Sequence, residues 1–301
     1  METDPNLIIK GVATFIATSQ LFIKSAYWLE KIRRKIKVKK ETIEILFDFV
    51  ADTDVTCGTI HPLYKGLIPP PDKETTALLR EWICQYFKRG REEKYSSIQL
   101  GPPNWNKHLC SIGGPVNHPH IRYQMGYDLR GENWISILPY FFPLREAKTT
   151  GITVQQKWDG NVIIEEPNWY IADRNNIPRF VPRVDQRILQ TDFVMIIVTP
   201  NTFTQRAFHS NQKHMMIVGA HSAAQLAIKD VLNNNKILGE LNSIRGKSEY
   251  FQAIIEIPKI KHTTKGELPD GKPILRDLVP LDLNKFQKLK EYEDWKKQVS
   301  I

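Results

Sequence analysis

Residues 213–228 read KHMMIVGAHSAAQLAI and give the clearest structural signal in the chain. The mostly apolar run 214–218 is typical of a strand that is covered on both faces. Gly219 then allows a tight turn, and Ser222 begins a helical pattern. Ser222 and Gln225 have the spacing of a capping box, in which the serine hydroxyl accepts a hydrogen bond from the Gln225 amide. The stretch therefore predicts a strand, a glycine turn and a helix.

The turn at Gly219 has two interpretations. A helix N-terminus leaves free N–H groups and about half a positive charge, which suits a phosphate or a carboxylate. On this basis Gly219, His221 and Ser222 are candidates to bind an anionic ligand. The other interpretation is that Gly219 is only a turn and Ser222 only a cap. A nucleophilic Ser222 is disfavoured because the Gly-x-Ser-x-Gly elbow is missing.

A second glycine turn follows a short apolar segment at 108–112. It begins at Gly113 and Gly114, and it resembles a Rossmann-like phosphate loop without the full G-x-G-x-x-G fingerprint. Ligands of open α/β sheets bind at the carboxyl ends of the strands. We therefore expect both turns to flank one crevice, with Asn117 as a further ligand-binding candidate and Arg122 as an anion partner.

Two histidines, His118 and His120, follow the second turn on either side of Pro119. A His-x-His pair suggests a metal, but a metal site needs a third and a fourth ligand that the sequence does not reveal. The sequence therefore predicts polar loop histidines near the ligand and no metal site.

Composition bounds the class of protein. The chain has 301 residues, 41% of them hydrophobic and 25% charged, which is typical of a globular protein. The sequence contains no run of eighteen apolar residues, so it predicts no membrane span. The N-terminus lacks the features of a secretory signal. Cys57, Cys84 and Cys110 are widely spaced, which favours reduced thiols in a cytoplasmic protein over disulfides or zinc.

The net charge of +9 is concentrated near the N-terminus. Residues 1–40 contain nine basic and three acidic residues and therefore hold most of this charge. The rest of the chain lacks the basic surface that is typical of nucleic-acid-binding proteins. An amphipathic helix followed by a polybasic run at 31–40 is typical of a segment that binds an anionic membrane surface. Docking on a protein partner or on the protein's own core is the alternative, and nucleic acid is less favoured. The residues that would make these contacts are Lys31, Arg33, Arg34, Lys35 and Lys37. The expected location is cytoplasmic, with peripheral binding at the inner membrane face, and oligomerisation stays open.

Two regions are expected. Residues 1–95, including 41–56, have helical periodicity, whereas 96–301 has the pattern of a Rossmann-like α/β domain that ends in a C-terminal helix. Within the second region the sequence predicts a strand at 134–142, a hairpin at 153–165, strands at 192–198 and 250–257, an irregular segment at 258–280 and a helix at 284–299.

Three segments resemble an uncharacterised prokaryotic Rossmann-like domain found near signalling and defence regulators: residues 112–117, residues 192–197 with Pro200 and Asn201, and residues 218–221. The resemblance spans about residues 105–258 and implies a mixed, mostly parallel sheet. The third segment lacks the second glycine expected of that domain. The resemblance assigns no catalytic residue.

Three functional hypotheses follow. The first is a sensor or effector that binds a nucleotide-like anion, with a nucleotide or dinucleotide as the expected ligand, and couples binding to a membrane or partner through the N-terminal helix. The second is a hydrolase or transferase that acts on a nucleoside or NAD-like substrate, with His221, Ser222, Asp192 and Glu165 as candidate catalytic residues. The third is a structural or adaptor protein without a ligand.

Overall fold

The computed structural model describes most of the chain after residue 103 and parts of the chain before it. The residues that it describes are 25, 28–33, 40–52, 54–57, 74–79, 81–82, 104–115, 118–128, 134–144, 155–156, 162–163, 169–186, 188–263 and 266–297.

A six-stranded sheet lies at the centre of this described part, in the order β1-β2-β11-β10-β12-β15. The strands are β1 (Asp54–Cys57), β2 (Leu109–Ile112), β10 (Asp192–Pro200), β11 (Lys213–Gly219), β12 (Phe251–Ile257) and β15 (Ile274–Pro280). β2 is parallel to β1 and to β11, whereas β10 is antiparallel to both β11 and β12, and β12 is antiparallel to β15. The expectation of a Rossmann-like, mostly parallel sheet is therefore wrong.

The direction of β10 explains the error. Every residue of β10 is buried, and a strand covered on both faces is apolar whichever way it runs, so the pattern alone does not reveal its direction. β10 and β11 are joined by residues 201–212, which contain the short helix α5 (Gln205–His209). This connection returns the chain to the neighbouring position in the opposite direction, as in an antiparallel pair.

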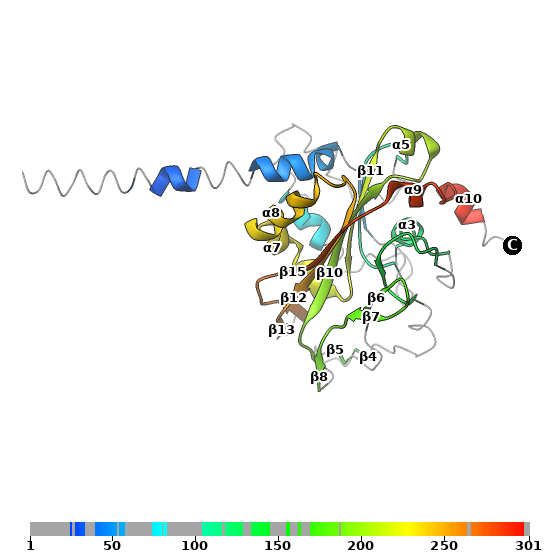
Figure 1. Ribbon diagram of the computed structural model, residues 1–301. Coiled ribbons are helices and arrows are strands. Elements are labelled where there is room, and N and C mark those ends of the chain that lie inside the picture. The colour runs from blue at the N-terminus through cyan, green and yellow to red at the C-terminus, as the bar shows by residue number, and fades with distance from the viewer. Residues whose placement is uncertain are drawn as a thin grey trace, which may run out of the picture.

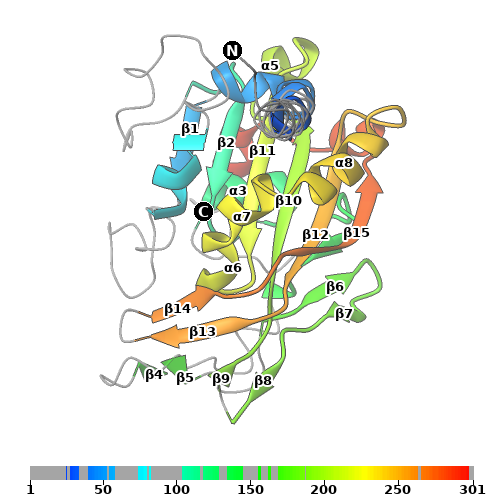
Figure 2. The ribbon, with the colours of Figure 1, turned by 90° about the vertical axis from the view of Figure 1, so that its left-hand side faces the viewer.

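Helices cover both faces of the sheet. Figure 2 shows α6 (Ser222–Leu226), α7 (Ile228–Leu232) and α8 (Asn235–Ile244) in front of the strands. On the opposite side lie α3 (Pro119–Gln124), α9 (Leu283–Phe286) and α10 (Tyr292–Lys297) (Figure 1). The predicted strand, turn and helix of residues 213–228 are confirmed, and the helix is divided at Ala227 into α6 and α7.

Several of the described residues before position 96 belong to the same core. Ile43, Phe47, Leu79 and Trp82 are buried in one hydrophobic cluster with the strands of the sheet. The helical expectation for 41–56 is confirmed only at its start, because a helix over 40–46 is followed by the 3-10 helix η1 (Asp48–Asp52) and then by β1. No helix within the described ranges has the length and apolar character that crossing a membrane requires.

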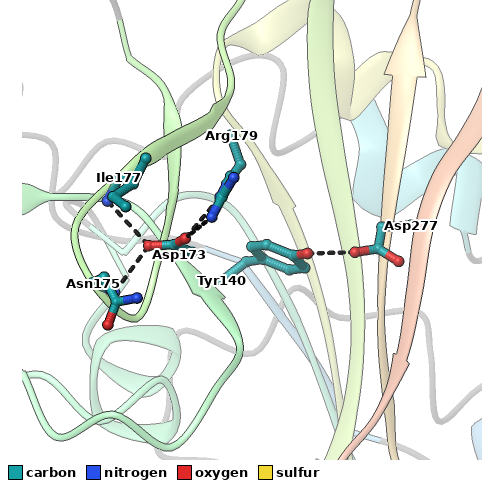
Figure 3. Close-up of polar contacts among 6 residues, drawn as sticks. All are labelled: Tyr140, Asp173, Asn175, Ile177, Arg179 and Asp277. Carbon is teal, nitrogen blue, oxygen red and sulfur yellow. Dashed lines mark hydrogen bonds and ion pairs between the residues drawn. The ribbon is translucent and has the colours of Figure 1, made fainter.

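A small sheet of β3 (Tyr140–Phe141), β6 (Ile171–Asp173) and β7 (Pro178–Phe180) is attached to the main sheet by polar contacts. The buried amide of Gln252 on β12 donates to the Tyr140 carbonyl at 2.9 Å and accepts from the Tyr140 N–H at 3.0 Å. The Tyr140 hydroxyl donates to Asp277 on β15 (Figure 3). Burial, followed by this hydrogen bond, raises the pKa of Tyr140 to about 12.

Asp173, on the same small sheet, holds the turn between β6 and β7. Its carboxylate accepts hydrogen bonds from the Asn175 and Ile177 N–H groups and from the guanidinium of Arg179 (Figure 3). Of the strand predicted at 134–142, only β3 and an isolated bridge at Trp134 are present.

Short strands complete the described fold: β4 (Gln155–Gln156), β5 (Val162–Ile163), β8 (Val184–Asp185), β9 (Ile188–Leu189), β13 (Ile260–Thr263) and β14 (Gly266–Pro269). The antiparallel pairing of β4 with β5 confirms the predicted hairpin, whose turn lies outside the described residues. The expectation of an irregular segment at 258–280 is wrong, because β13, β14 and most of β15 lie there. The predicted C-terminal helix is two short helices, α9 and α10.

Candidate functional site

The structure places both glycine turns at the same rim of the sheet. β2 and β11 are parallel neighbours, so Gly113 and Gly219 both lie at carboxyl ends of strands. The Gly113 N–H donates to the Ile217 carbonyl at 3.1 Å, and the φ of +133° at Gly113 is one that side-chain-bearing residues rarely adopt. Beyond this contact the two segments separate, because Gly113 leads toward α3 and Gly219 leads to α6 on the opposite face (Figures 1 and 2).

The Gly219 turn is filled by the protein itself. A Cβ atom at Gly219 would lie 2.7 Å from Cγ of Gln225 and 2.7 Å from the carbonyl oxygen of His221. The residue that precedes α6 as its N-cap is His221 and not Ser222, and its side chain makes no capping hydrogen bond. The backbone of Ser222 begins the helix. Its side chain is not among those that the structure describes.

Asp192, the first residue of β10, supplies the anion at the start of α6. Because β10 is antiparallel to β11, its first residue lies at the rim where β11 ends. The fully buried carboxylate accepts from the Ala224 N–H at 3.0 Å through Oδ2, and from the Phe193 N–H at 2.8 Å through Oδ1. The position that was expected to attract a ligand's phosphate is therefore occupied by an internal carboxylate.

The same carboxylate orients His221. Oδ1 of Asp192 lies 3.0 Å from Nδ1 of His221. A carboxylate oxygen only accepts, so Nδ1 carries the proton and the lone pair of a neutral ring is on Nε2. Nε2 is buried and has no hydrogen-bond partner among the described residues. The His221 side chain is 13% exposed. The Asp192–His221 pair thus leaves one basic nitrogen at the rim without a protein partner within that part of the chain.

A second acid and imidazole lie beside this pair, on the hairpin of β13 and β14. His262 and Glu267 are direct cross-strand partners, and Nδ1 of His262 is 3.8 Å from Oε1 of Glu267. Burial raises the pKa of Glu267, and the nearby Asp192 raises it further, whereas the positive charge that His221 and His262 can carry lowers it. β14 packs against α6, and Figure 2 shows the hairpin across the end of the sheet below that helix.

The candidate residues from the sequence are thus only partly brought together. His221 and Asp192 are in contact, whereas Asn117 and Glu165 lie outside the described residues. Arg122 lies beside the second glycine turn and donates from Nε to the Pro115 carbonyl at 2.8 Å. Gly114 has open space where a Cβ would be.

His262 and Glu267 were not found from the sequence. Their signal was a short segment of alternating character between Ile260 and Pro269, which resembles a hairpin only if the prolines and glycines around it are assigned to its ends.

The prediction that His118 and His120 are polar loop residues is wrong, because His118 is the N-cap of α3, His120 lies within that helix, and their rings belong to an aromatic cluster. Their rings are 4.9 Å apart, and the ring of His120 is 4.8 Å from Trp105, 5.4 Å from Tyr292 and 5.6 Å from Phe203. Burial, and then the charge of Lys296, lowers the pKa of His120 to about 4. Among the residues with described positions, no group of three or more His, Cys, Asp or Glu side chains is arranged to hold a metal ion.

Comparison of the chain with protein-family models, with curated proteins and with solved structures gives no significant match. The chemistry of the residues at the rim is therefore the basis for a functional proposal.

Proposed function

We propose that the protein is a hydrolase or transferase in which His221 is the general base. The observation that supports this proposal is the contact between Asp192 and His221, which leaves Nε2 without a protein partner among the described residues. A buried carboxylate that fixes one imidazole nitrogen and leaves the other without a hydrogen-bond partner is the arrangement used by bases that deprotonate a hydroxyl or a water.

The charges at the rim favour catalysis over the sensing of an anion. The N-terminus of α6 is already neutralised by Asp192, and Glu267 lies close enough for the two acids to interact. A phosphate placed at the Gly219 turn would meet this carboxylate at short range in a buried setting, where like charges repel strongly. The reacting part of the substrate is therefore expected to be neutral or cationic, and any phosphates to lie farther from Asp192.

The proposed step is a proton transfer at a named atom. Nε2 of His221 removes a proton from water or from a substrate hydroxyl as that oxygen attacks the electrophilic centre. Asp192 stabilises the imidazolium that forms, because the hydrogen bond at Nδ1 becomes an ion pair. A nucleoside or NAD-like molecule remains the predicted substrate class; in NAD the bond to the positively charged nicotinamide ring would suit the acidic rim.

Substitution of His221 with asparagine is the test. The asparagine amide nitrogen takes approximately the place of Nδ1 and still donates to Asp192, but it provides no base. We expect the full-length wild-type protein to convert at least one member of a panel of NAD, nucleosides and nucleotides, and His221→Asn to lower the rate about 100-fold to 10,000-fold. Product formation is measured by chromatography, with melting temperatures to show that both proteins are folded.

The control is His209→Asn, because His209 is exposed on α5. It is expected to retain the wild-type rate. Equal rates for His221→Asn and the wild type contradict the role of His221, and the absence of product from the whole panel contradicts the proposed substrate class.

We also propose that the N-terminal segment binds an anionic membrane surface. Trp28 and Leu29 lie in the described helix over 28–33 and are each 60% exposed, next to the exposed Lys31 and Arg33. Exposed apolar side chains beside cations support this interpretation.

Cosedimentation with liposomes that contain phosphatidylserine tests the membrane proposal. Each cation contributes about 1 kcal/mol near such a surface, so we expect a variant in which five basic residues become glutamine to lose at least about 100-fold in affinity. The five are Lys31, Arg33, Arg34, Lys35 and Lys37. Binding that is equal on uncharged liposomes, or no binding by the wild type, would refute the membrane interpretation.

A further inference from the structure

The hairpin of β13 and β14 places a second titratable pair beside the Asp192–His221 pair. Glu267 comes from β14, which packs against α6, and His262 is its cross-strand partner on β13. Glu267 is close enough to His221 and Asp192 to interact with their charges. The Glu267 side chain is only 7% exposed, and its Oε1 is buried without a hydrogen-bond partner among the described residues. A buried carboxyl oxygen is costly to leave unpaired, so its presence at a candidate site indicates a use for it.

The hydrogen bonds of His262 determine where its lone pair lies. Nε2 is 2.7 Å from the carbonyl oxygen of Leu189. A carbonyl only accepts, so Nε2 carries a proton, and in the neutral ring the lone pair is on Nδ1. That lone pair lies on the nitrogen nearest to Oε1 of Glu267, at 3.8 Å.

Two acceptors facing each other in a buried position repel unless one of them is protonated. If Glu267 were ionised and His262 neutral, a lone pair would oppose a carboxylate with Asp192 close by. One proton shared by Glu267 and His262 removes this conflict, whichever group carries it. Burial and Asp192 shift the proton toward Glu267, since both raise the pKa of that carboxyl.

We propose that Glu267 is the proton donor that complements His221, and that His262 shares and resupplies its proton. This inference rests on the proposed function. As Nε2 of His221 takes a proton from the attacking hydroxyl, Glu267 gives a proton to a leaving oxygen or nitrogen that would otherwise depart as an anion, as the base of a nucleoside does and the nicotinamide of NAD does not. One proton is taken up and one is released, so the reaction is balanced. The imidazolium of His221 then loses its proton to solvent, and Glu267 regains one through His262.

The protonation of Glu267 is measurable without a substrate. Glutamate side-chain carboxyls of the full-length protein are isotope-labelled and followed by NMR as a function of pH, and Glu267→Gln identifies the Glu267 signal. We expect a titration midpoint above the ordinary value of 4.5. In His262→Gln the midpoint is expected to rise further, because the imidazole charge that lowers it is gone. A midpoint near the ordinary value that His262→Gln leaves unchanged overturns the inference.

Kinetics supply the second readout. With the substrate identified by the panel, Glu267→Gln is expected to lower turnover about 100-fold or more. It is also expected to abolish the decline in rate at high pH that reports loss of the acidic proton. A Glu267→Gln variant with the wild-type pH profile contradicts the role of Glu267. The control is Glu240→Gln, since Glu240 lies on α8 with its side chain 43% exposed.

The outcomes separate the two proposals. If the wild type and His221→Asn differ in activity but Glu267 titrates normally, the proposed role of His221 as the base stands and the proposed role of Glu267 as the acid is rejected. If Glu267 titrates high and responds to His262→Gln, but no compound of the panel is converted, the shared proton is established and the proposed enzymatic function fails.

Discussion

Replacement of Asp192 with alanine is expected to lower the free energy of unfolding by about 3–5 kcal/mol. The substitution removes the acceptor for three donors at once, the N–H groups of Phe193 and Ala224 and Nδ1 of His221. Removal of one partner from a buried charged network typically costs this much, because the groups left behind are buried and unsatisfied. Urea unfolding with an unchanged m value would show the loss as a shift of the midpoint Cm.

The asparagine variant separates charge from shape. Asp192→Asn keeps the size of the side chain, but its NH₂ group must face one of the N–H donors, so we expect a loss of roughly 2–3 kcal/mol. The control is Asp185→Ala, because Asp185 is exposed on β8 and is expected to change stability by no more than about 0.5 kcal/mol. A loss below about 1 kcal/mol for Asp192→Ala would mean that the carboxylate does not hold the start of α6.

Two buried histidines, His120 on α3 and His214 on β11, are expected to make the protein unstable in acid. Burial lowers the pKa of His120 from 6.5 to about 4, and it lowers the pKa of His214 well below its ordinary value. The unfolded chain therefore binds these protons more readily than the folded protein, so stability falls as the pH drops below 6.5 and continues to fall through about 4. His120 alone accounts for roughly 2–3 kcal/mol by pH 4.

His120→Phe tests this dependence. Nδ1 of His120 is buried without a partner among the described residues, and the ring is surrounded by aromatic side chains. Phenylalanine fills the same place and cannot take up a proton, so we expect the stability of the variant to decline less steeply between pH 6.5 and 4. Urea unfolding at a series of pH values measures the slope. His209→Gln, on the exposed surface of α5, is expected to keep the wild-type slope, and a His120→Phe slope equal to the wild-type slope would contradict the assignment.

Local structure could be predicted where one short pattern was sufficient. Residues 213–228 predicted a strand, a glycine turn and a helix because each signal lies within a few residues of the next. Strand direction could not be predicted in the same way, since the buried β10 is apolar on both faces. The antiparallel course of β10 also determines the site, because it brings Asp192 to the rim where β11 ends.

The site was predictable only in part. The sequence named Asp192 and His221 as polar candidates but did not relate them, and it expected an external anion where Asp192 lies. The pairing of His262 with Glu267 depends on the cross-strand register of a hairpin. The prolines and glycines around this segment prevented the prediction of that register from the sequence. A single buried acid that begins an apolar strand is nevertheless a signal, because such a group requires donors from another element.

The tautomer of His221 tests the central claim most directly. Ring nitrogens are isotope-labelled, and NMR distinguishes a protonated from an unprotonated nitrogen in the neutral imidazole. The contact with Asp192 predicts that Nδ1 is protonated and Nε2 is not, and that Asp192→Ala removes this preference. A proton on Nε2 in the wild type, or a mixture of tautomers that Asp192→Ala leaves unchanged, would contradict the proposed base.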